Sequence, residues 1–300
     1  IEDRHNLSFI GREREIEILR NAYQKAQQGK FVSVCISGDT GVGKTRLVHE
    51  FAKSLPAERT RGLATECLFV ERDRPLSAAA DSLCSVLDIW ATAPESTLNQ
   101  KVGQLLRRAP KTEAKIASFV GSLLKSPEHL WDKFPGGNLA LIQQMVSVFG
   151  TLVSLASRQN PLVFVIENAH WMDGASIDVL NELARRHSNE RVMVILLCEK
   201  EAMPERHFPT SEAIFLSALS DETIRQLLFD RLGRSEAMHV LIDQIVSRVQ
   251  GNPYFASEIV DSLEEQNVIA RDENNEDSAY RRVKQGRIQL PPTVASIAAR

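Results

Sequence analysis

The chain has 300 residues, of which 43% are hydrophobic and 25% are charged, and its net charge at pH 7 is -3. This composition is typical of a globular protein large enough for two domains, and the slightly acidic balance gives no basic footprint for nucleic acid. We expect no apolar run long enough to span a membrane and no signal peptide, because the N-terminus is charged. The sequence therefore predicts a cytoplasmic protein that contacts neither a membrane nor, through this part of the chain, nucleic acid.

The four cysteines are expected to be buried thiols in a reducing compartment, since no pair has metal-ligand spacing. They are Cys35, Cys67, Cys84 and Cys198.

The first predicted elements are a helix and a strand. The segment Phe9-Ile10-Gly11-Arg12-Glu13-Arg14-Glu15 leads into a helix whose apolar face carries Ile16, Leu19 and Tyr23, and Gly29 ends it. The run Phe31–Ile36 is apolar and rich in β-branched residues, which indicates a buried strand.

Directly after this strand comes Gly38-Asp39-Thr40-Gly41-Val42-Gly43-Lys44-Thr45, which has the P-loop spacing, followed by a predicted helix. Glycines let backbone N–H groups turn inward around phosphate oxygens, and the helix adds its positive N-terminal end. Lys44 is then placed to reach the β- and γ-phosphates and the Thr45 hydroxyl to bind Mg²⁺. The predicted nucleotide-binding residues here are Asp39, Thr40, Gly41, Val42, Gly43, Lys44, Thr45 and Arg46.

A second strand is predicted over residues 62–70, followed by a helix through Leu83 and Leu87. Residues 93–134 hold short helical pieces broken by prolines. We interpret them as a helical insertion that covers one edge of a sheet, with a dedicated site for a protein partner as the alternative. A long amphipathic helix then runs through Leu139 and Leu152.

The apolar run Leu162–Ile166 predicts a central strand buried on both faces, and Glu167 stands at its end. A carboxylate in this position of a P-loop protein holds Mg²⁺. The alternative is a helix-capping or loop charge. His170, beside Trp171, is expected to pack or hydrogen-bond rather than act as a base.

Further strands are predicted at residues 192–198 and 213–216. Strands that alternate with helices predict an α/β fold, a P-loop three-layer α/β/α sandwich with a parallel sheet, whose ligand lies at the carboxyl ends of the strands. After Ser220 the pattern becomes helical, at residues 221–231, 235–249 and 254–266, and residues 267–290 resemble a hairpin with an acidic tip at 272–277. The predicted domains are therefore a nucleotide-binding domain (1–219), a helical lid (220–266), and a hairpin with a further region (267–300).

Four sequence segments, in their order along the chain, resemble those of the signal-transduction ATPases with numerous domains (STAND). These proteins are a branch of the P-loop ATPases related to AAA+ proteins. The likeness is to ATPase modules attached to class III nucleotide cyclases, LuxR-type activators and some serine/threonine kinases. The blocks are the segment at residues 9–15, the P-loop, Glu167-Asn168-Ala169-His170-Trp171-Met172-Asp173, and Gly251-Asn252-Pro253-Tyr254-Phe255.

The resemblance implies that Ile10, Gly11 and Arg12 line the adenine and ribose end and that Pro253 closes over the base from the lid. It also implies that residues 290–294 begin a winged-helix region, so we expect the chain to be part of a longer protein. The preference for adenine over guanine rests on the resemblance alone.

Two departures from the family pattern predict slow turnover, with Lys44, Glu167 and Asn168 as the catalytic candidates. Where the family has a second acid after Glu167, this chain has Asn168, which can orient a water but cannot accept its proton. Where relatives place an arginine that senses the γ-phosphate, this chain has Glu199 and Lys200.

We therefore expect a switch module that binds ATP or ADP with Mg²⁺, hydrolyses ATP slowly, and works with further domains of the same polypeptide. One alternative is an active ATPase that needs an arginine finger from a neighbour in a homo-oligomer. Another is a nucleotide-locked scaffold that binds a protein partner through residues 93–134.

Overall fold

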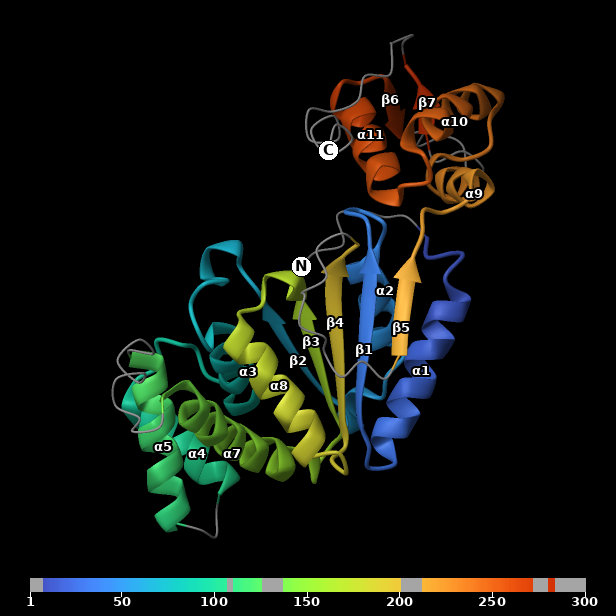
Figure 1. Cartoon of the computed structure of the whole chain (residues 1–300). Helices are drawn as coiled ribbons and strands as arrows, with labels where there is room; N and C mark the ends of the chain where they lie inside the picture. The colour runs from blue at the N-terminus through green and yellow to red at the C-terminus, as the bar shows by residue number, and fades with distance from the viewer. Residues whose placement is uncertain (1–7, 107–109, 126–136, 201–211, 272–279, 284–300) are drawn as a thin grey trace. The chain divides into compact units, whose positions relative to one another are not determined.

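The computed structural model describes residues 8–106, 110–125, 137–200, 212–271 and 280–283. Its centre is a five-stranded sheet with the order β2-β3-β4-β1-β5 (Figure 1). The strands are β1 (Phe31–Gly38), β2 (Arg61–Glu66), β3 (Leu162–Glu167), β4 (Val192–Glu199) and β5 (Glu212–Leu216).

The sheet is parallel, as the alternation of strands and helices predicts. β2 pairs in parallel with β3, and β3 with β4, and the strand arrows of Figure 1 point the same way. β4 is buried along its length up to Cys198, whereas the edge strand β2 alternates between buried and exposed residues. The predicted α/β fold is confirmed, and the carboxyl ends of these strands meet at one edge of the sheet.

Helices precede, follow and connect the strands. They are α1 (Glu13–Gln27), α2 (Lys44–Lys53), α3 (Ser77–Leu87), α4 (Glu95–Leu105), α5 (Pro110–Lys125), α7 (Gly137–Ser157) and α8 (Gly174–Arg186). α3 packs on β2, α7 on α8, and α4 on α5 and α7. The described parts of the predicted insertion, α4 and α5, are helical as expected.

One carboxylate fixes the starts of two of these helices. Asp173 is 3% exposed and caps α8 by accepting hydrogen bonds from the Ser176 backbone N–H and hydroxyl, at 2.9 and 2.6 Å. It also accepts from the backbone N–H groups of Leu76 (2.8 Å) and Ala78 (3.4 Å) and from the Ser77 hydroxyl (3.2 Å) at the start of α3. The segments that follow β2 and β3 are therefore joined through Asp173.

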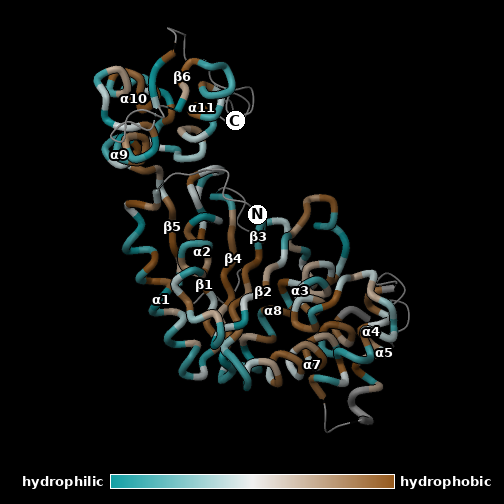
Figure 2. The backbone as a smooth tube through the Cα atoms, turned by 180° about the vertical axis from the view of Figure 1, so that it is seen from behind, coloured by the Kyte–Doolittle hydropathy of each residue, from teal (hydrophilic) through white to brown (hydrophobic). Residues whose placement is uncertain are grey.

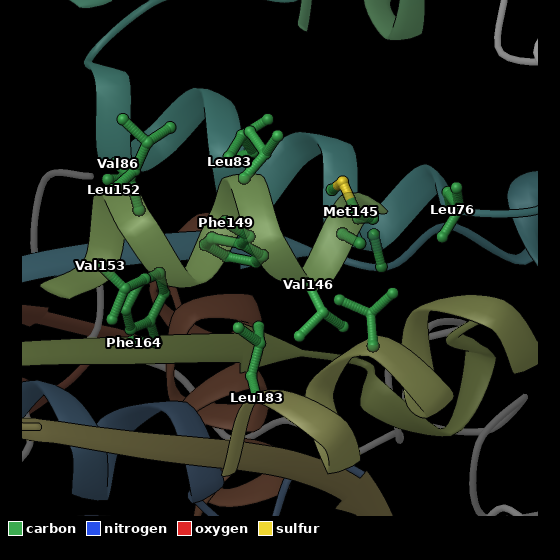
Figure 3. Packing of buried hydrophobic residues seen from close by; sticks show 14 of the residues in the cluster. Leu76, Leu83, Val86, Met145, Val146, Phe149, Leu152, Val153, Phe164 and Leu183 are labelled. Atoms are coloured by element: carbon green, nitrogen blue, oxygen red, sulfur yellow. The ribbon is translucent and has the colours of Figure 1, made fainter. Parts of the chain in front are cut away.

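The main apolar core lies where α3, α7 and α8 meet β3 (Figure 3). Phe149 of α7 contacts Phe164 of β3 edge to face, with ring centroids 6.2 Å apart. Val146, Leu152 and Leu183 pack around this pair as fully or almost fully buried side chains.

α7 corrects one expectation. Its segment Leu139–Ser157 has 19 residues and a mean hydropathy of 1.7, so it is long and apolar enough to cross a membrane, which the sequence analysis did not anticipate. Half of that window is buried inside the protein, and the helix is largely brown in Figure 2. Its apolar side chains supply much of the core in Figure 3, which accounts for its composition.

The second strand is shorter than predicted. β2 ends at Glu66, and Phe69–Glu71 form a 3-10 turn that leaves Phe69 and Val70 exposed. The reason lies in the neighbouring strand, since β3 ends at Glu167 and Asn168 then turns the backbone into the left-handed region, with φ of 51°. Beyond Cys67, whose N–H donates to the Glu167 carbonyl, β2 has no strand to pair with.

The described residues divide into two compact units. The sheet unit lies within Glu17–Ser37 and Phe51–Ile214. The cradle unit lies within Ile1–Ile16, Gly38–Glu50 and Phe215–Arg300, so the N-terminal segment and the P-loop group with the C-terminal helices. The domain boundary near Leu219 stays a prediction.

The cradle unit has a core of its own. It is built by α9 (Asp221–Leu232), α10 (Glu236–Val249) and α11 (Pro253–Glu265), which match the three helices expected there. β6 (Ile269–Arg271) and β7 (Tyr280–Arg282) follow and pair antiparallel, as a hairpin requires. The predicted acidic tip at 272–277 and the predicted start of a winged-helix region at 290–294 lie outside the described residues.

Candidate nucleotide-binding site

The P-loop has the strand-loop-helix form that its sequence predicts. β1 ends at Gly38, and α2 begins at Lys44. Gly41 and Gly43 have φ of +81° and +101°, values that L side chains rarely adopt. The Lys44 ammonium donates to the Gly38 and Asp39 carbonyls at 2.8 and 3.0 Å, which closes the loop on itself.

These features fit a phosphate group. The first turn of α2 contains no acidic residue, so no carboxylate competes for the positive end of this helix. Thr45 is exposed in the same turn. Arg46 pairs with Glu50 across one turn of α2, with 3.0 Å between Nε and Oε1.

The segment before α1 binds the P-loop through Arg12, which is 7% exposed. Its guanidinium donates to the Ser217 carbonyl at 2.6 Å and to the Val42 carbonyl at 3.4 Å, and it lies 3.5 Å from Glu15. Burial lowers the pKa of Arg12 below its ordinary value, and Glu15 partly offsets this. Arg12 thus connects the P-loop with the segment that follows β5. A position of Arg12 at the adenine and ribose end of the nucleotide stays a prediction.

Its neighbours Ile10 and Gly11 contact the helices of the cradle unit. Ile10 packs against the core of α9, α10 and α11. Gly11 has φ of +78°, and a Cβ there would stand 3.1 Å from the Thr223 side chain at the start of α9. These two residues therefore lie at the boundary between the N-terminal segment and the helices.

A second link to the P-loop comes from Asn252, the residue before Pro253. Its Oδ1 caps α11 by accepting from the N–H groups of Tyr254 (3.0 Å) and Phe255 (3.3 Å), and Pro253 occupies the first turn. Its Nδ2 donates to the Thr40 carbonyl at 3.0 Å. A Cβ on Gly41 would stand 2.9 Å from Asn252 Oδ1, so the cap and the loop are in close contact.

In the sheet unit, Glu167 ends β3 half-buried, and Asn168 follows it in the left-handed conformation. The Asn168 amide nitrogen donates to Glu66 Oε1 at 3.2 Å. Glu66 is the last residue of β2 and stands opposite Glu167 in the parallel register. Two carboxylates and one amide thus end adjacent strands.

His170 lies close to the end of β4, as a packing residue would. Its side chain is 2% exposed and contacts Trp171, with ring centroids 4.7 Å apart and the ring planes tilted by 57°. Its Nδ1 accepts from the Glu199 backbone N–H at 3.4 Å, and its Nε2 lies 4.0 Å from the Glu199 carboxylate. Glu199 ends β4, where the resemblance led us to look for a sensor of the γ-phosphate.

Two polar residues of this arrangement, Glu66 and Asn252, were missed as functional candidates. Asn252 lies in the block Gly251-Asn252-Pro253-Tyr254-Phe255. An asparagine directly before a proline is a helix-start signal, and this signal could have identified Asn252 as the N-cap of the following helix. The contact of Glu66 with Asn168 depends on the register of β2 against β3, which the sequence pattern does not specify.

Comparison with known families settles the class of protein. A family model described as an AAA ATPase domain matches residues 8–195, more than half of the chain. The chain belongs to this family. A second model, described as a domain of unknown function, matches residues 220–277 of this AAA ATPase domain protein and so covers its C-terminal helices.

Similar proteins are distant. The uncharacterized protein R02095 of Rhizobium meliloti (strain 1021) is 26% identical over 183 residues, which are 59% of this AAA ATPase chain and 17% of the relative. The chain therefore spans about one sixth of that relative's length.

The chain is also similar to solved structures. The Drosophila ORC bound to DNA matches with a TM-score of 0.51 and 16% identity, over 88% of this chain and 60% of that one. Cdc6p from Pyrobaculum aerophilum matches with a TM-score of 0.49 and 12% identity, over 89% of this chain and 67% of that one. The first likeness supports the AAA+ fold, and the P-loop and family match together identify a nucleotide-binding ATPase domain.

Proposed function

We propose that this AAA ATPase domain is a nucleotide-dependent switch with slow ATP hydrolysis. The observation that carries the proposal is the hydrogen bond from Asn252 to the Thr40 carbonyl. A single side chain starts helix α11 and holds the P-loop backbone, so a phosphate that reshapes the loop also acts on the C-terminal helices. Arg12 adds a second link of the same kind through Val42.

A switch requires that ATP and ADP differ in their contacts, because a ligand shifts an equilibrium only by its differential affinity for the two states. We propose that Lys44 responds to the β- and γ-phosphates through its ammonium, which donates to the Gly38 and Asp39 carbonyls. ATP and ADP would thus make different contacts with Lys44 and with the P-loop, whose Thr40 carbonyl accepts a hydrogen bond from Asn252.

Mg²⁺ belongs to the same proposal. The Thr45 hydroxyl and the Glu167 carboxylate are oxygen ligands of the kind Mg²⁺ prefers, and such sites are usually completed by water and substrate phosphates. When bound, the ion would neutralise phosphate charge during hydrolysis. Asp39, Thr40, Gly41, Val42, Gly43 and Arg46 are proposed to surround the phosphates, with Ile10, Gly11, Arg12 and Pro253 toward the base.

We also propose that the domain is of the STAND type and acts within a longer regulatory chain. The four sequence blocks support this, and the relative from Rhizobium meliloti extends far beyond the matched region. In this proposal the longer chain contains the further domains, receives the signal, and contacts any protein partner or homo-oligomeric neighbour.

The test is amide hydrogen exchange of the purified chain without nucleotide, with ADP-Mg²⁺ and with ATP-Mg²⁺, using Lys44→Ala as the control. The proposal predicts that exchange in α11 and in the P-loop differs among the three states and that Lys44→Ala removes these differences. Equal exchange of α11 in all three states, in a protein shown to bind nucleotide, would refute the switch and leave a static nucleotide-binding domain.

A further inference from the structure

Two of the four buried cysteines lie next to each other. Cys35 is in β1 and Cys198 in β4, and these strands are neighbours in the sheet. Their sulfur atoms are 4.0 Å apart, within the range of a weak hydrogen bond between thiols. Both residues belong to the sheet unit, so the distance lies within one compact part of the chain. The two positions are 163 residues apart, and no spacing in the sequence predicts their contact.

The positions of the two cysteines suit a disulfide bond. Neighbouring strands lie about 4.8 Å apart, and the two Cα atoms of a disulfide usually lie about 4.4–6.8 Å apart. Both side chains belong to the main apolar core, so they leave the sheet on the same face. The sulfurs must approach from 4.0 Å to the bond length of about 2.05 Å, a movement that side-chain rotation covers.

The contact also favours the thiolate of Cys35, and the thiolate is the form that attacks an oxidant. A hydrogen bond with Cys198 lowers the pKa of Cys35 below its ordinary value, although burial opposes this shift. For the other two cysteines burial is the largest influence, and it raises the pKa of Cys67 to about 12 and that of Cys84 to about 11. An oxidant should therefore act on the pair before it acts on Cys67 or Cys84.

The pair lies close to the carboxyl ends of its strands. Cys35 is 3% and Cys198 0% exposed, so a bulky reagent does not reach either sulfur in the folded chain. Cys198 is followed by the half-buried Glu199 and the exposed Lys200, and Cys35 stands three residues before Gly38, the last residue of β1. The ends of elements open locally at a lower free energy than the centre of a sheet. A molecule as small as hydrogen peroxide needs to reach only one of the two sulfurs.

We propose that Cys35 and Cys198 form a reversible disulfide when the chain meets hydrogen peroxide. The Cys35 thiolate attacks one peroxide oxygen, the O–O bond breaks, and the hydroxide that leaves takes up the proton that Cys35 lost, which gives a sulfenic acid on Cys35 and one water. The Cys198 sulfur then attacks the Cys35 sulfur, the S–O bond breaks, and the oxygen leaves as a second water with the proton of the Cys198 thiol. The two sulfurs are oxidised, and the peroxide is reduced to two waters.

The bridge would join β4 to the strand that leads into the P-loop, since β1 ends at Gly38. A dithiol reductant reverses it by thiol–disulfide exchange. The inference goes beyond the proposed switch and does not depend on nucleotide binding, because both sulfurs lie in the sheet unit and peroxide is the co-reactant.

The experiment exposes the folded, reduced chain to hydrogen peroxide, then unfolds it in urea with iodoacetamide and counts the alkylated cysteines by mass spectrometry. We expect the count in the wild type to fall from four to two, and peptide mapping to show one bridge between Cys35 and Cys198. Dithiothreitol added before alkylation should restore all four. The double variant Cys67→Ala with Cys84→Ala is the matched control, because it keeps the pair and should form the same bridge, whereas Cys198→Ala should form none.

A second comparison shows whether the fold selects this pair. The chain unfolded in urea before peroxide is added should give several linkages, since four cysteines can pair in three ways. Four alkylated cysteines in the folded wild type, with peroxide that oxidises glutathione in a separate sample, would overturn the proposal. A bridge to Cys67 or Cys84 in the folded chain would also overturn it, as would a bridge between Cys35 and Cys198 that is no more abundant in the folded chain than in the unfolded one.

Discussion

The Asn252 side chain makes two kinds of hydrogen bond whose contributions to stability can be measured separately. Its Oδ1 caps α11, and its Nδ2 donates to the Thr40 carbonyl. Loss of an asparagine N-cap costs about 1 kcal/mol, and loss of one neutral hydrogen bond costs about 1 kcal/mol. Asn252→Ala removes both, so we expect it to lower the free energy of unfolding of the cradle unit by about 2 kcal/mol.

Asn252→Asp separates the two contributions. A carboxylate still caps the helix and suits its positive end, but it cannot donate to Thr40. We expect a loss of about 1 kcal/mol in stability. If that energy orders the P-loop for phosphate, ADP affinity falls about fivefold in both variants, since 1.4 kcal/mol corresponds to a factor of ten.

The assay is a urea titration of each variant together with calorimetric titration of ADP. Ser220→Ala is the matched control, because the Ser220 hydroxyl caps α9 by accepting from the Thr223 N–H at 3.2 Å. It should cost about 1 kcal/mol in stability and leave ADP affinity unchanged. Wild-type ADP affinity in Asn252→Asp would show that the contact with Thr40 does not order the loop and would refute the reasoning.

Three further predictions concern buried polar groups. Arg12→Lys keeps the charge but loses the planar guanidinium that donates to both the Ser217 and the Val42 carbonyl. Thermal denaturation should therefore show that the free energy of unfolding falls by about 1–2 kcal/mol, and an unchanged midpoint would contradict this prediction. Asp173→Asn places an N–H₂ group against the donors that start α3 and α8, and urea unfolding should show a loss of about 3 kcal/mol, whereas a loss below about 1 kcal/mol would count against its double role. Burial raises the pKa of Cys67 to about 12, so thiolate is scarce at pH 8 and iodoacetamide should label this cysteine only after unfolding in urea; rapid labelling of the folded chain would show that the site opens.

The sequence predicted the main architecture well because its signals are local. The P-loop spacing, the buried run that ends at Glu167 and the helical periodicity after Ser220 each depend on neighbours within one element. The family match and the fold of the Drosophila ORC bear out the AAA+ ATPase class.

The structural features that the sequence did not predict depend on contacts between segments far apart along the chain. The end of β2 at Glu66 follows from where its partner β3 stops, and the bond between Asn168 and Glu66 joins residues 102 positions apart. The contact between Asn252 and Thr40 spans 212 positions. Neither pairing has a periodicity or a spacing that a single sequence displays. The apolar length of α7 was underestimated for a similar reason, since a helix that faces other helices over much of its surface need not show a polar face.

The proposed switch requires that the P-loop binds nucleotide, and calorimetric titration of ADP-Mg²⁺ and ATP-Mg²⁺ into the wild type and Lys44→Ala measures this binding. We expect the wild type to bind both nucleotides and Lys44→Ala to bind them about 30-fold more weakly, as loss of a charge-assisted contact of about 2 kcal/mol requires. Equal affinities in the two proteins, or no binding by the folded wild type, would contradict a nucleotide site at the P-loop.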